Sequence, residues 1–162
     1  MKLNRHQPTA RLALRKQQGM TMLEVLIAVM ILSVGLLGIA GLQTSNLRNS
    51  QSAHQRTMAV LLASSMAERI RANRALALSN GYSVVKTCPT TVLDPATITS
   101  ASIAEHEKKH WLNEIARSIG VAAKPCGEVT FSGRTYTVTV YWDDSRALGG
   151  RADMAIRNMV SL

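Results

Sequence analysis

The chain has 162 residues, of which 46% are hydrophobic, and its formal net charge is +9. That length leaves room for one small domain beside any leader or membrane segment. Residues 1–19 contain five Lys or Arg and no acid, so the rest of the chain has 14 basic and 10 acidic residues, a net charge of +4. A nucleic-acid partner inferred from the total charge would therefore rest largely on the leader, and we do not expect one.

A long apolar segment follows this basic leader. Residues 25–47 are uncharged over 23 positions, and Ser33 is the only polar residue in the first 18 of them. About 20 apolar residues suffice to cross the hydrocarbon core as a helix, so residues 20–47 are expected to form a membrane-spanning helix. The basic residues before it predict a cytoplasmic N-terminus, with everything after the helix on the far side of the membrane.

Glu24 stands at the start of the apolar segment, where an unpaired carboxylate is costly. If the chain is cut after Gly19, the new amino group of Met20 lies one helical turn from Glu24, at nearly the same depth. The amine and the carboxylate could then pair within one subunit or between neighbours, which would recruit and register subunits. The alternative is that Glu24 merely lies among the lipid headgroups.

The helix is expected to continue beyond the membrane surface. No proline or glycine occurs between positions 43 and 78, so residues 48–78 should extend the helix until the Asn80-Gly81 turn ends it. An apolar stripe with a four-residue repeat predicts that one face is buried, formed by Met58, Leu62, Met66 and Ile70 and joined by Leu61 and Ser65.

Residues 79–162 predict a small globular domain that contains one helix and several strands. A short strand is expected at residues 82–85 within a loop. A helix over residues 103–119 is indicated by a Ser102–Glu105 capping box and by Gly120 at its end. Three further strands are predicted, the first two of them forming a hairpin: 128–131, 134–142 and 154–160. The fold class is therefore α+β, with a long N-terminal helix packed on a small antiparallel sheet and a second, short helix.

Two cysteines, Cys88 and Cys126, both follow the membrane segment. On the far side of a bacterial-type membrane such a pair favours a disulfide over a redox motif. Closing a loop of this length would stabilise the domain by roughly 3–4 kcal/mol in the chain-entropy account. Free, buried thiols are the alternative.

The segment that begins at Gly19, G-M-T-M-L-E-V-L-I-A-V-M-I-L, resembles the processing and N-methylation site of type IV prepilins. Other segments are similar to minor pilins of the PilV type, the type IV pilus modification proteins. These are V-M-I-L-S-V-G-L-L-G-I-A-G-L-Q, M-A-E-R-I-R-A-N-R and Y-T-V-T-V-Y-W-D-D, at residues 29–43, 66–74 and 136–144.

The resemblance implies a pilin-like, non-enzymatic structural subunit that needs no cofactor. Gly19 would precede the scissile bond, Met20 would be the N-methylated mature terminus, and Glu24 would be the carboxylate needed for assembly. The chain would be anchored in the bacterial inner membrane with its domain in the periplasm, and would enter the fibre or prime its assembly. Its expected partners are a prepilin peptidase that also methylates, the inner-membrane assembly platform, and other minor and major pilins through the N-terminal helix.

Two other functions compete with this interpretation. A minor pseudopilin of a type II secretion system would have the same anchor and a similar domain. The sequence His106-Glu107-Lys108-Lys109-His110 matches the H-E-x-x-H pattern of zinc peptidases. At 100° per residue both histidines face away from the apolar side of their helix, and no third ligand is apparent beyond Glu128, so we expect no metal site.

Two charged clusters have ordinary explanations. Asp143-Asp144 lacks the alternating oxygen ligands of a calcium loop and is expected to form a turn after a strand. Arg69, Arg71 and Arg74 could contact DNA, as in a single-pass DNA receptor or adhesin, but a solvated helix face or subunit contacts are preferred.

Overall fold

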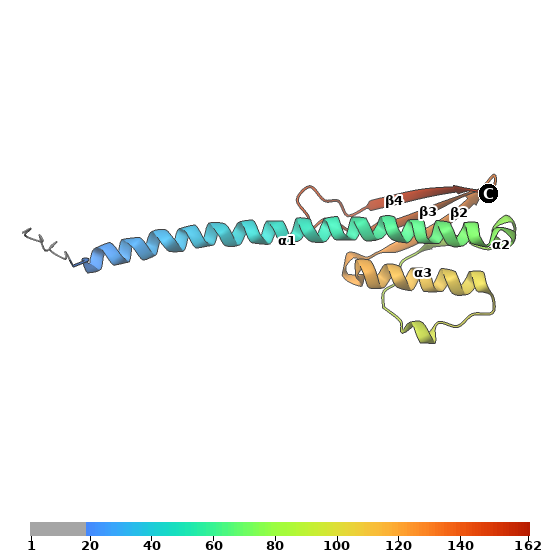
Figure 1. Ribbon diagram of the computed structural model, residues 1–162, viewed down its shortest axis with the longest axis horizontal. Coiled ribbons are helices and arrows are strands. Elements are labelled where there is room, and N and C mark those ends of the chain that lie inside the picture. Colours follow the sequence, from blue (N-terminus) through green and yellow to red (C-terminus); the bar gives the residue numbers. More distant parts are fainter. Residues whose placement is uncertain (1–18) are drawn as a thin grey trace, which may run out of the picture. The chain divides into compact units, whose positions relative to one another are not determined.

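The computed structural model describes residues 19–162, shown in Figure 1. The leader expected over residues 1–19 lies outside the described residues, apart from Gly19. The first helix, α1, runs from Met22 to Ala72. The chain divides between Ala40 and Gly41 into two compact units, so α1 contributes to both.

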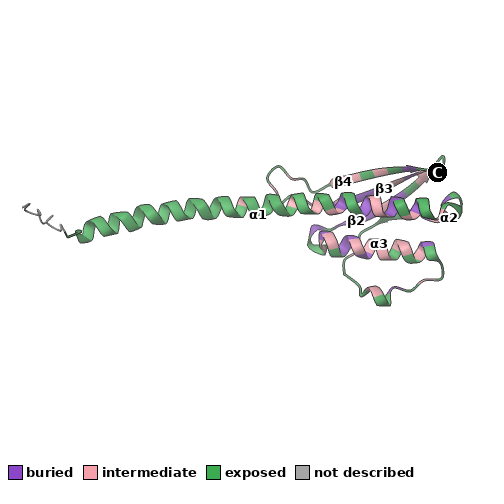
Figure 2. Ribbon diagram, in the orientation of Figure 1, coloured by how far each residue is buried: buried purple, intermediate pink, exposed green. Residues whose placement is uncertain are grey.

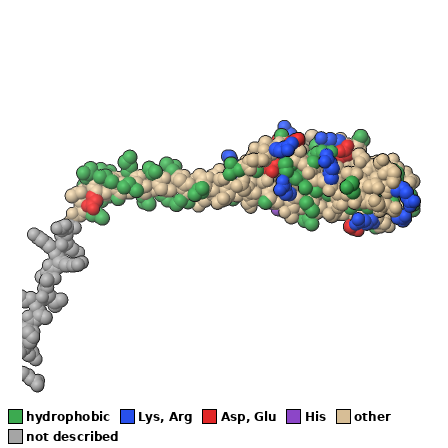
Figure 3. All heavy atoms as spheres, turned by 90° about the horizontal axis from the view of Figure 1, so that it is seen from above, with side chains coloured by type: hydrophobic (Ala, Val, Ile, Leu, Met, Phe, Trp, Pro, Cys, Tyr) green, Lys and Arg blue, Asp and Glu red, His purple; other side chains and the backbone are tan. Residues whose placement is uncertain are grey.

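The described residues of the first unit, 19–40, contain the apolar part of α1. Every residue from Gly19 to Ala40 is exposed, which Figure 2 shows as an unbroken green ribbon. Hydrophobic side chains cover this part of the helix in Figure 3. The hydroxyl of Ser33 donates a hydrogen bond to the backbone oxygen of Val29 at 2.7 Å. This polar side chain is therefore satisfied within the helix, as an apolar surrounding requires.

The second unit is an α+β domain, as the sequence predicts. It has a four-stranded antiparallel sheet in the order β1-β2-β3-β4. After α1, its elements are α2 (Arg74–Leu78), β1 (Val84–Thr87), a short 3-10 helix η1 (Pro95–Thr97), α3 (Ile103–Ile119), a second one η2 (Val121–Ala123), β2 (Cys126–Ser132), β3 (Thr135–Trp142) and β4 (Met154–Ser161). The later part of α1 and α3 pack on one face of the sheet.

The core of this unit follows from the alternation along β3. Tyr136, Val138, Val140 and Trp142 are buried on the face toward the helices, while the threonines between them lie on the other face. Val138 lies between Val129 of β2 and Asn158 of β4 in the register. The predicted period of two, the hairpin and the last strand are thus confirmed. The turn of the hairpin comes one residue later than predicted, because Gly133 and Arg134 both have positive φ.

Helix α3 lies where the sequence predicts. The Ser102 hydroxyl accepts a hydrogen bond from the backbone N–H of Glu105 at 3.2 Å, which caps the start of the helix. Gly120 ends it with a φ of +89°, a conformation that residues other than glycine adopt at a cost. The indole N–H of Trp111 donates to the backbone oxygen of Leu62 at 2.9 Å and so joins α3 to α1.

Gly127 permits α3 to lie close to the sheet. A Cβ atom on this residue would come within 2.6 Å of the Trp111 ring and within 2.9 Å of Ile115. Contacts that short do not occur between real atoms, so the glycine is required by packing. The sequence alone does not reveal this role.

The predicted continuous helix to residue 78 is wrong in one respect: it is interrupted at Asn73. That residue has φ −117° and ψ 55°, outside the helical region, and α2 begins immediately after it. Asparagine side chains compete with the helical hydrogen-bond ladder, so asparagine is favoured where a helix breaks.

Two smaller predictions also need correction. The first strand spans Val84–Thr87 rather than residues 82–85, because Tyr82 is fully buried in the core instead of lying in the sheet. Leu61 is 56% exposed and does not join the buried stripe. Three alanines join the larger side chains in that stripe. The buried residues of α1 are Ala59, Leu62, Ala63, Met66, Ala67 and Ile70.

Candidate functional site

The start of α1 holds the residues that the sequence singles out. Gly19, Met20 and Thr21 are not helical, and α1 begins at Met22. The backbone N–H of Glu24 lies 3.1 Å from the backbone oxygen of Thr21 and 3.3 Å from its hydroxyl oxygen. Thr21 therefore caps the helix by accepting from one of its free N–H groups.

Glu24 lies in the first turn of α1 and is exposed. The positive end of the helix dipole favours a carboxylate there by about 0.3–1 kcal/mol. The spacing from Thr21 to Glu24 is that of a capping box, a signal that our sequence analysis missed although the residues T-M-L-E display it. The Thr21 cap thus defines where α1 begins and places Glu24 in its first turn.

Gly19 and Met20 precede the helix, and both are exposed. The Met20 side chain is 76% exposed, and a Cβ atom added to Gly19 would meet no atom within 4 Å. Within residues 19–162, no atom lies close enough to Gly19 to require glycine at this position.

The helix that follows is suited to a membrane. Helix α1 contains an 18-residue window with a mean hydropathy of 2.7, none of it buried within the chain. Among residues 19–162 it is the one helix that is long and apolar enough to cross a membrane. These features are consistent with a membrane-anchored, single-pass protein.

Two of the three H-E-x-x-H side chains have partners within the domain. Glu107 accepts a hydrogen bond from the Tyr82 hydroxyl at 2.5 Å, and Nδ1 of His110 lies 3.1 Å from a carboxylate oxygen of Glu114. His106 is exposed as expected, but His110 is only 32% exposed, so its prediction as a solvent-facing residue is wrong. Arg69 of α1 also binds Glu114, which thus contacts both Arg69 and His110.

No metal centre emerges from these residues. Within the part of the chain that the structure describes, no group of three or more His, Cys, Asp or Glu side chains could hold a metal ion. Glu128, the third ligand considered from sequence, instead accepts a hydrogen bond from the Tyr141 hydroxyl at 2.5 Å. That hydrogen bond, followed by burial, raises the pKa of Tyr141.

Tyr82 has a strongly raised pKa. Burial, followed by its hydrogen bond to Glu107, raises its pKa from 10.0 to about 12. Both causes favour the protonated phenol, which donates to the carboxylate. Tyr82 thus links the loop after α2 to α3 as a structural contact.

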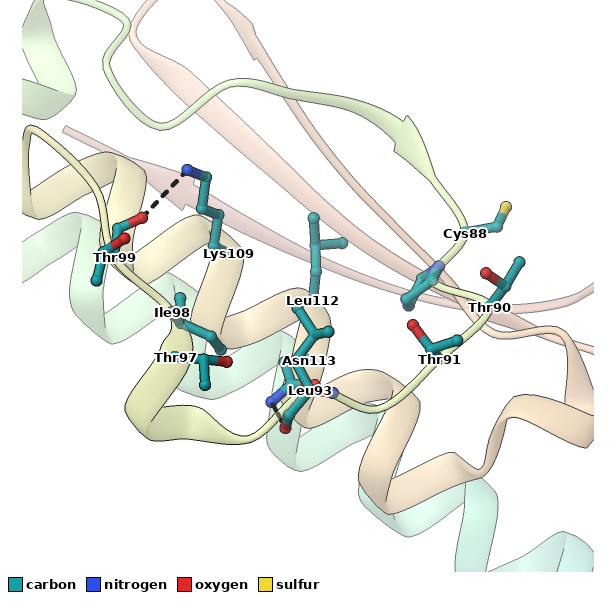
Figure 4. Close-up of a pocket in the computed structure, with 11 residues that line it drawn as sticks. Cys88, Thr90, Thr91, Leu93, Thr97, Ile98, Thr99, Lys109, Leu112 and Asn113 are labelled. Atoms are coloured by element: carbon teal, nitrogen blue, oxygen red, sulfur yellow. Dashed lines mark hydrogen bonds between the residues drawn. The ribbon is translucent and has the colours of Figure 1, made fainter.

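A hollow lies between α3 and the loop that follows β1. Figure 4 shows this cavity, about 520 Å³ in volume, with threonines, Lys109 and Asn113 around it. The Asn113 amide binds both the N–H and the carbonyl oxygen of Leu93, at 2.7 and 3.0 Å. Lys109 binds the backbone oxygen of Thr99 and the Glu105 carboxylate. These polar groups hold the loop against α3 and do not form a catalytic arrangement.

Cys88 and Cys126 form a disulfide in the structure. The bond joins the loop after β1 to the first residue of β2. It therefore fixes one end of the loop that borders the cavity of Figure 4.

Most residues of the two charged clusters, Asp143-Asp144 and Arg69, Arg71 and Arg74, make contacts within the domain. The Asp144 side chain is largely buried and accepts a hydrogen bond from the Ser52 hydroxyl of α1 at 2.6 Å. The prediction that Arg69 lies on a solvated face is wrong, since it is only 22% exposed and forms an ion pair with Glu114 at 2.9 Å. Arg71 pairs with Glu68 on the same helix, and Arg74 is exposed.

One comparison with known proteins identifies the start of the chain. The family model for the prokaryotic N-terminal methylation motif matches residues 14–40, which include Gly19, Met20 and Glu24. The match supports a type IV pilin-like prepilin, either a pilin or a pseudopilin, of a kind that is structural rather than enzymatic. No curated protein matches the chain. No solved structure matches it either.

Proposed function

We propose that this chain is a minor pilin of the PilV type: a non-enzymatic structural subunit that helps to prime assembly of a type IV pilus. The observation that carries the proposal is the arrangement at the start of α1. An exposed, non-helical Gly19–Met20 bond precedes a helix that has Glu24 in its first turn and an entirely exposed apolar surface.

Each part of this arrangement has a function in the proposed pathway. A membrane prepilin peptidase cuts after Gly19 and methylates the new amino group of Met20. The non-helical segment suits such an enzyme, because a peptide bond inside a helix is protected by its hydrogen bonds. The leader over residues 1–19 is removed, and residues 20–47 remain as the anchor in the inner membrane, with the domain in the periplasm.

Assembly then depends on Glu24. In an apolar bundle its carboxylate is costly unless a cation lies at the same depth. The methylated amine of Met20 is such a cation, on the same subunit or on a neighbour. The apolar helices exchange lipid for contacts with other minor and major pilins, which retains their apolar surroundings.

The choice of the PilV type rests on segments with identifiable contacts in this fold. The segment at residues 66–74 contains Arg69, which binds α3, and Asn73, at which α1 ends. The segment at residues 136–144 is most of β3 together with Asp144, which binds α1. Both segments hold α1 to the rest of the domain.

Mass spectrometry of the N-terminal peptide from cells tests the proposal. We expect a peptide that begins with N-methylated Met20, and an intact leader would contradict the proposed route. Gly19→Val should abolish cleavage, whereas Gly35→Val is the matched control. Neither glycine has an atom of the described chain within 4 Å of an added Cβ, so neither change should disturb the fold.

A substitution at the carboxylate tests the role in assembly. Glu24→Gln should leave the protein in the membrane but strongly reduce its incorporation and the number of fibres. Glu68→Gln is the control, because Glu68 is an exposed carboxylate on the same helix. Unchanged incorporation and fibre number with Glu24→Gln would overturn the proposed mechanism.

A minor pseudopilin of a type II secretion system is the second candidate, because the methylation motif fits it equally well. Neighbouring genes for a secretin and for secreted hydrolases, in place of pilus genes, would favour it.

A further inference from the structure

We propose that His106 and His110 of α3 form a two-histidine chelate for a divalent transition-metal ion, of which Cu²⁺ binds most tightly. Glu114 is the positioning residue that holds His110. The inference concerns α3 and its contact with α1, and it does not depend on the proposed role in a pilus.

The two histidines lie one helical turn apart. Their ring centroids are 6.1 Å apart, with an angle of 31° between the ring planes. Two imidazoles that share a metal ion, each through a bond of about 2.0–2.1 Å, have ring centroids about 4.5–5.2 Å apart for square-planar to tetrahedral angles at the metal. His106 is exposed, so a side-chain movement of about 1 Å can bring the two rings to one ion.

His110 is held as a metal ligand needs to be held. Its Nδ1 atom is buried and lies 3.1 Å from a carboxylate oxygen of Glu114. A proton on Nδ1 is favoured beside a carboxylate, which leaves the lone pair on Nε2. The His110 side chain is partly exposed although Nδ1 is buried, so the exposed part of the ring lies away from Nδ1. Nε2 is therefore the nitrogen that is available to a metal.

Glu114 is in turn fixed from α1. Its second carboxylate oxygen lies 2.9 Å from the Arg69 guanidinium, which also donates to the backbone oxygen of Glu107 at 3.3 Å. Metal-binding histidines usually have such a carboxylate behind them, and its loss typically lowers metal affinity by about 10–100-fold. The sequence predicts no metal site because spacing on α3 alone does not show this support.

The basic residues around the pair are matched or turned away. Lys109 pairs with Glu105 at 3.1 Å and also donates to the backbone oxygen of Thr99. The charge of Arg69 is matched by Glu114. Lys108 is two positions from each histidine, which at 100° per residue puts it on the opposite side of α3. The two imidazoles can therefore accept a cation.

The pair binds a metal ion without the machinery of a peptidase. Residues 19–162 contain no group of three or more metal ligands, so the protein supplies two ligands and water supplies the others. Glu107, the residue that activates water in the H-E-x-x-H pattern, accepts the Tyr82 hydroxyl instead. The site is therefore one for binding and not for hydrolysis.

The test uses the full chain in detergent with Cu²⁺ alone as the probe. Electron paramagnetic resonance should show that the tightest Cu²⁺ site has two imidazole nitrogens, and competition with a chelator gives the affinity. His106→Ala and His110→Ala should each leave one imidazole and lower the affinity by about 100-fold or more, because loss of a ligand costs more than loss of its outer partner. His54→Ala is the matched control, since His54 is an exposed histidine of α1, and it should change neither quantity.

A second pair of variants tests the positioning role. Glu114→Gln should lower the Cu²⁺ affinity by about tenfold while the spectrum keeps two imidazoles. Glu68→Gln removes an exposed, ion-paired carboxylate of α1 and should leave the affinity unchanged. An unchanged affinity in Glu114→Gln would overturn the part assigned to Glu114.

A spectrum with fewer than two imidazoles in the unchanged chain, or an equal loss with His54→Ala, would overturn the whole inference. Because His106 is exposed, His106→Ala decides the question even if His110→Ala disturbs the packing of α3.

Discussion

The two halves of α1 face different surroundings although they belong to one helix. From Met22 to Ala40 the helix is apolar on all sides apart from Glu24 and Ser33, and every residue is exposed. Further along, Leu62, Met66 and Ile70 are buried on one side only, with polar residues on the others. In the first half, the uniformly apolar composition suits an apolar medium on all sides. In the second half, the apolar residues repeat with the helical period, so only one face is suited to packing against the sheet and α3. Perturbations of the domain should therefore affect the second half and leave the first unchanged.

Removal of the disulfide should give the largest effect of this kind. Cys88 and Cys126 are separated by 38 residues, and a crosslink of that span stabilises by about 4 kcal/mol in the chain-entropy account. The double variant Cys88→Ala, Cys126→Ala should lose about that much stability in urea unfolding in detergent, followed by fluorescence of the buried Trp111 and Trp142. Helicity of residues 22–40 should be retained. A loss of helicity there would contradict the separation of the two halves.

Two adjacent leucines allow a sharper test of the packed half. Leu62 is 8% exposed and Leu61 is 56% exposed, so the same substitution can be compared at neighbouring positions. Leu62→Ala should cost about 3 kcal/mol of unfolding free energy because it leaves a cavity between α1 and the rest of the core. Leu61→Ala should cost less than about 0.5 kcal/mol. Similar losses in the same urea titration would show that the buried face is assigned wrongly.

Alkaline pH should weaken only the packed half. The pKa of Tyr82 is about 12 in the folded chain and about 10 when exposed, so the folded state holds its proton more tightly. Its contribution is complete below pH 10 and is lost as the pH rises from 10 to 12, up to about 2 to 3 kcal/mol. Tyr82→Phe should flatten the dependence of stability on pH in this range. A residual slope remains from Tyr136 and Tyr141, whose pKa values are also raised. An unchanged slope in Tyr82→Phe would show that Tyr82 is not the group responsible.

The features that the sequence predicts well are those encoded within a few neighbouring residues. The capped helix α3, the hairpin with Tyr136, Val138 and Val140 on one face, and the apolar segment all follow from local spacing. The candidate site is also a prediction from local spacing, because Gly19, Met20 and Glu24 lie within six positions.

The features that the sequence does not predict depend on contacts between distant residues. The burial of Tyr82 depends on α3, whose Glu107 accepts its hydrogen bond, and the need for glycine at position 127 comes from Trp111. The sequence predicts that Arg69 is solvated, whereas in the structure it forms an ion pair with Glu114 of α3. Each case pairs residues whose separation in the sequence gives no sign of their contact.

The smallest expected effect concerns the first half of α1, at its cap. Thr21→Ala removes the hydroxyl that accepts from Glu24 N–H and should destabilise the first helical turn by about 1 kcal/mol, while Thr21→Ser should retain the cap. Amide exchange of residues 22–25 in lipid nanodiscs should rise by about fivefold in the alanine variant, with no change in the unfolding of the domain. Because Glu24 lies in that turn, fraying would also release its carboxylate from a fixed depth, so incorporation into fibres should fall in Thr21→Ala and recover in Thr21→Ser. Equal incorporation of the two variants would mean that the apolar medium alone holds the turn, and that the cap has no part in placing Glu24.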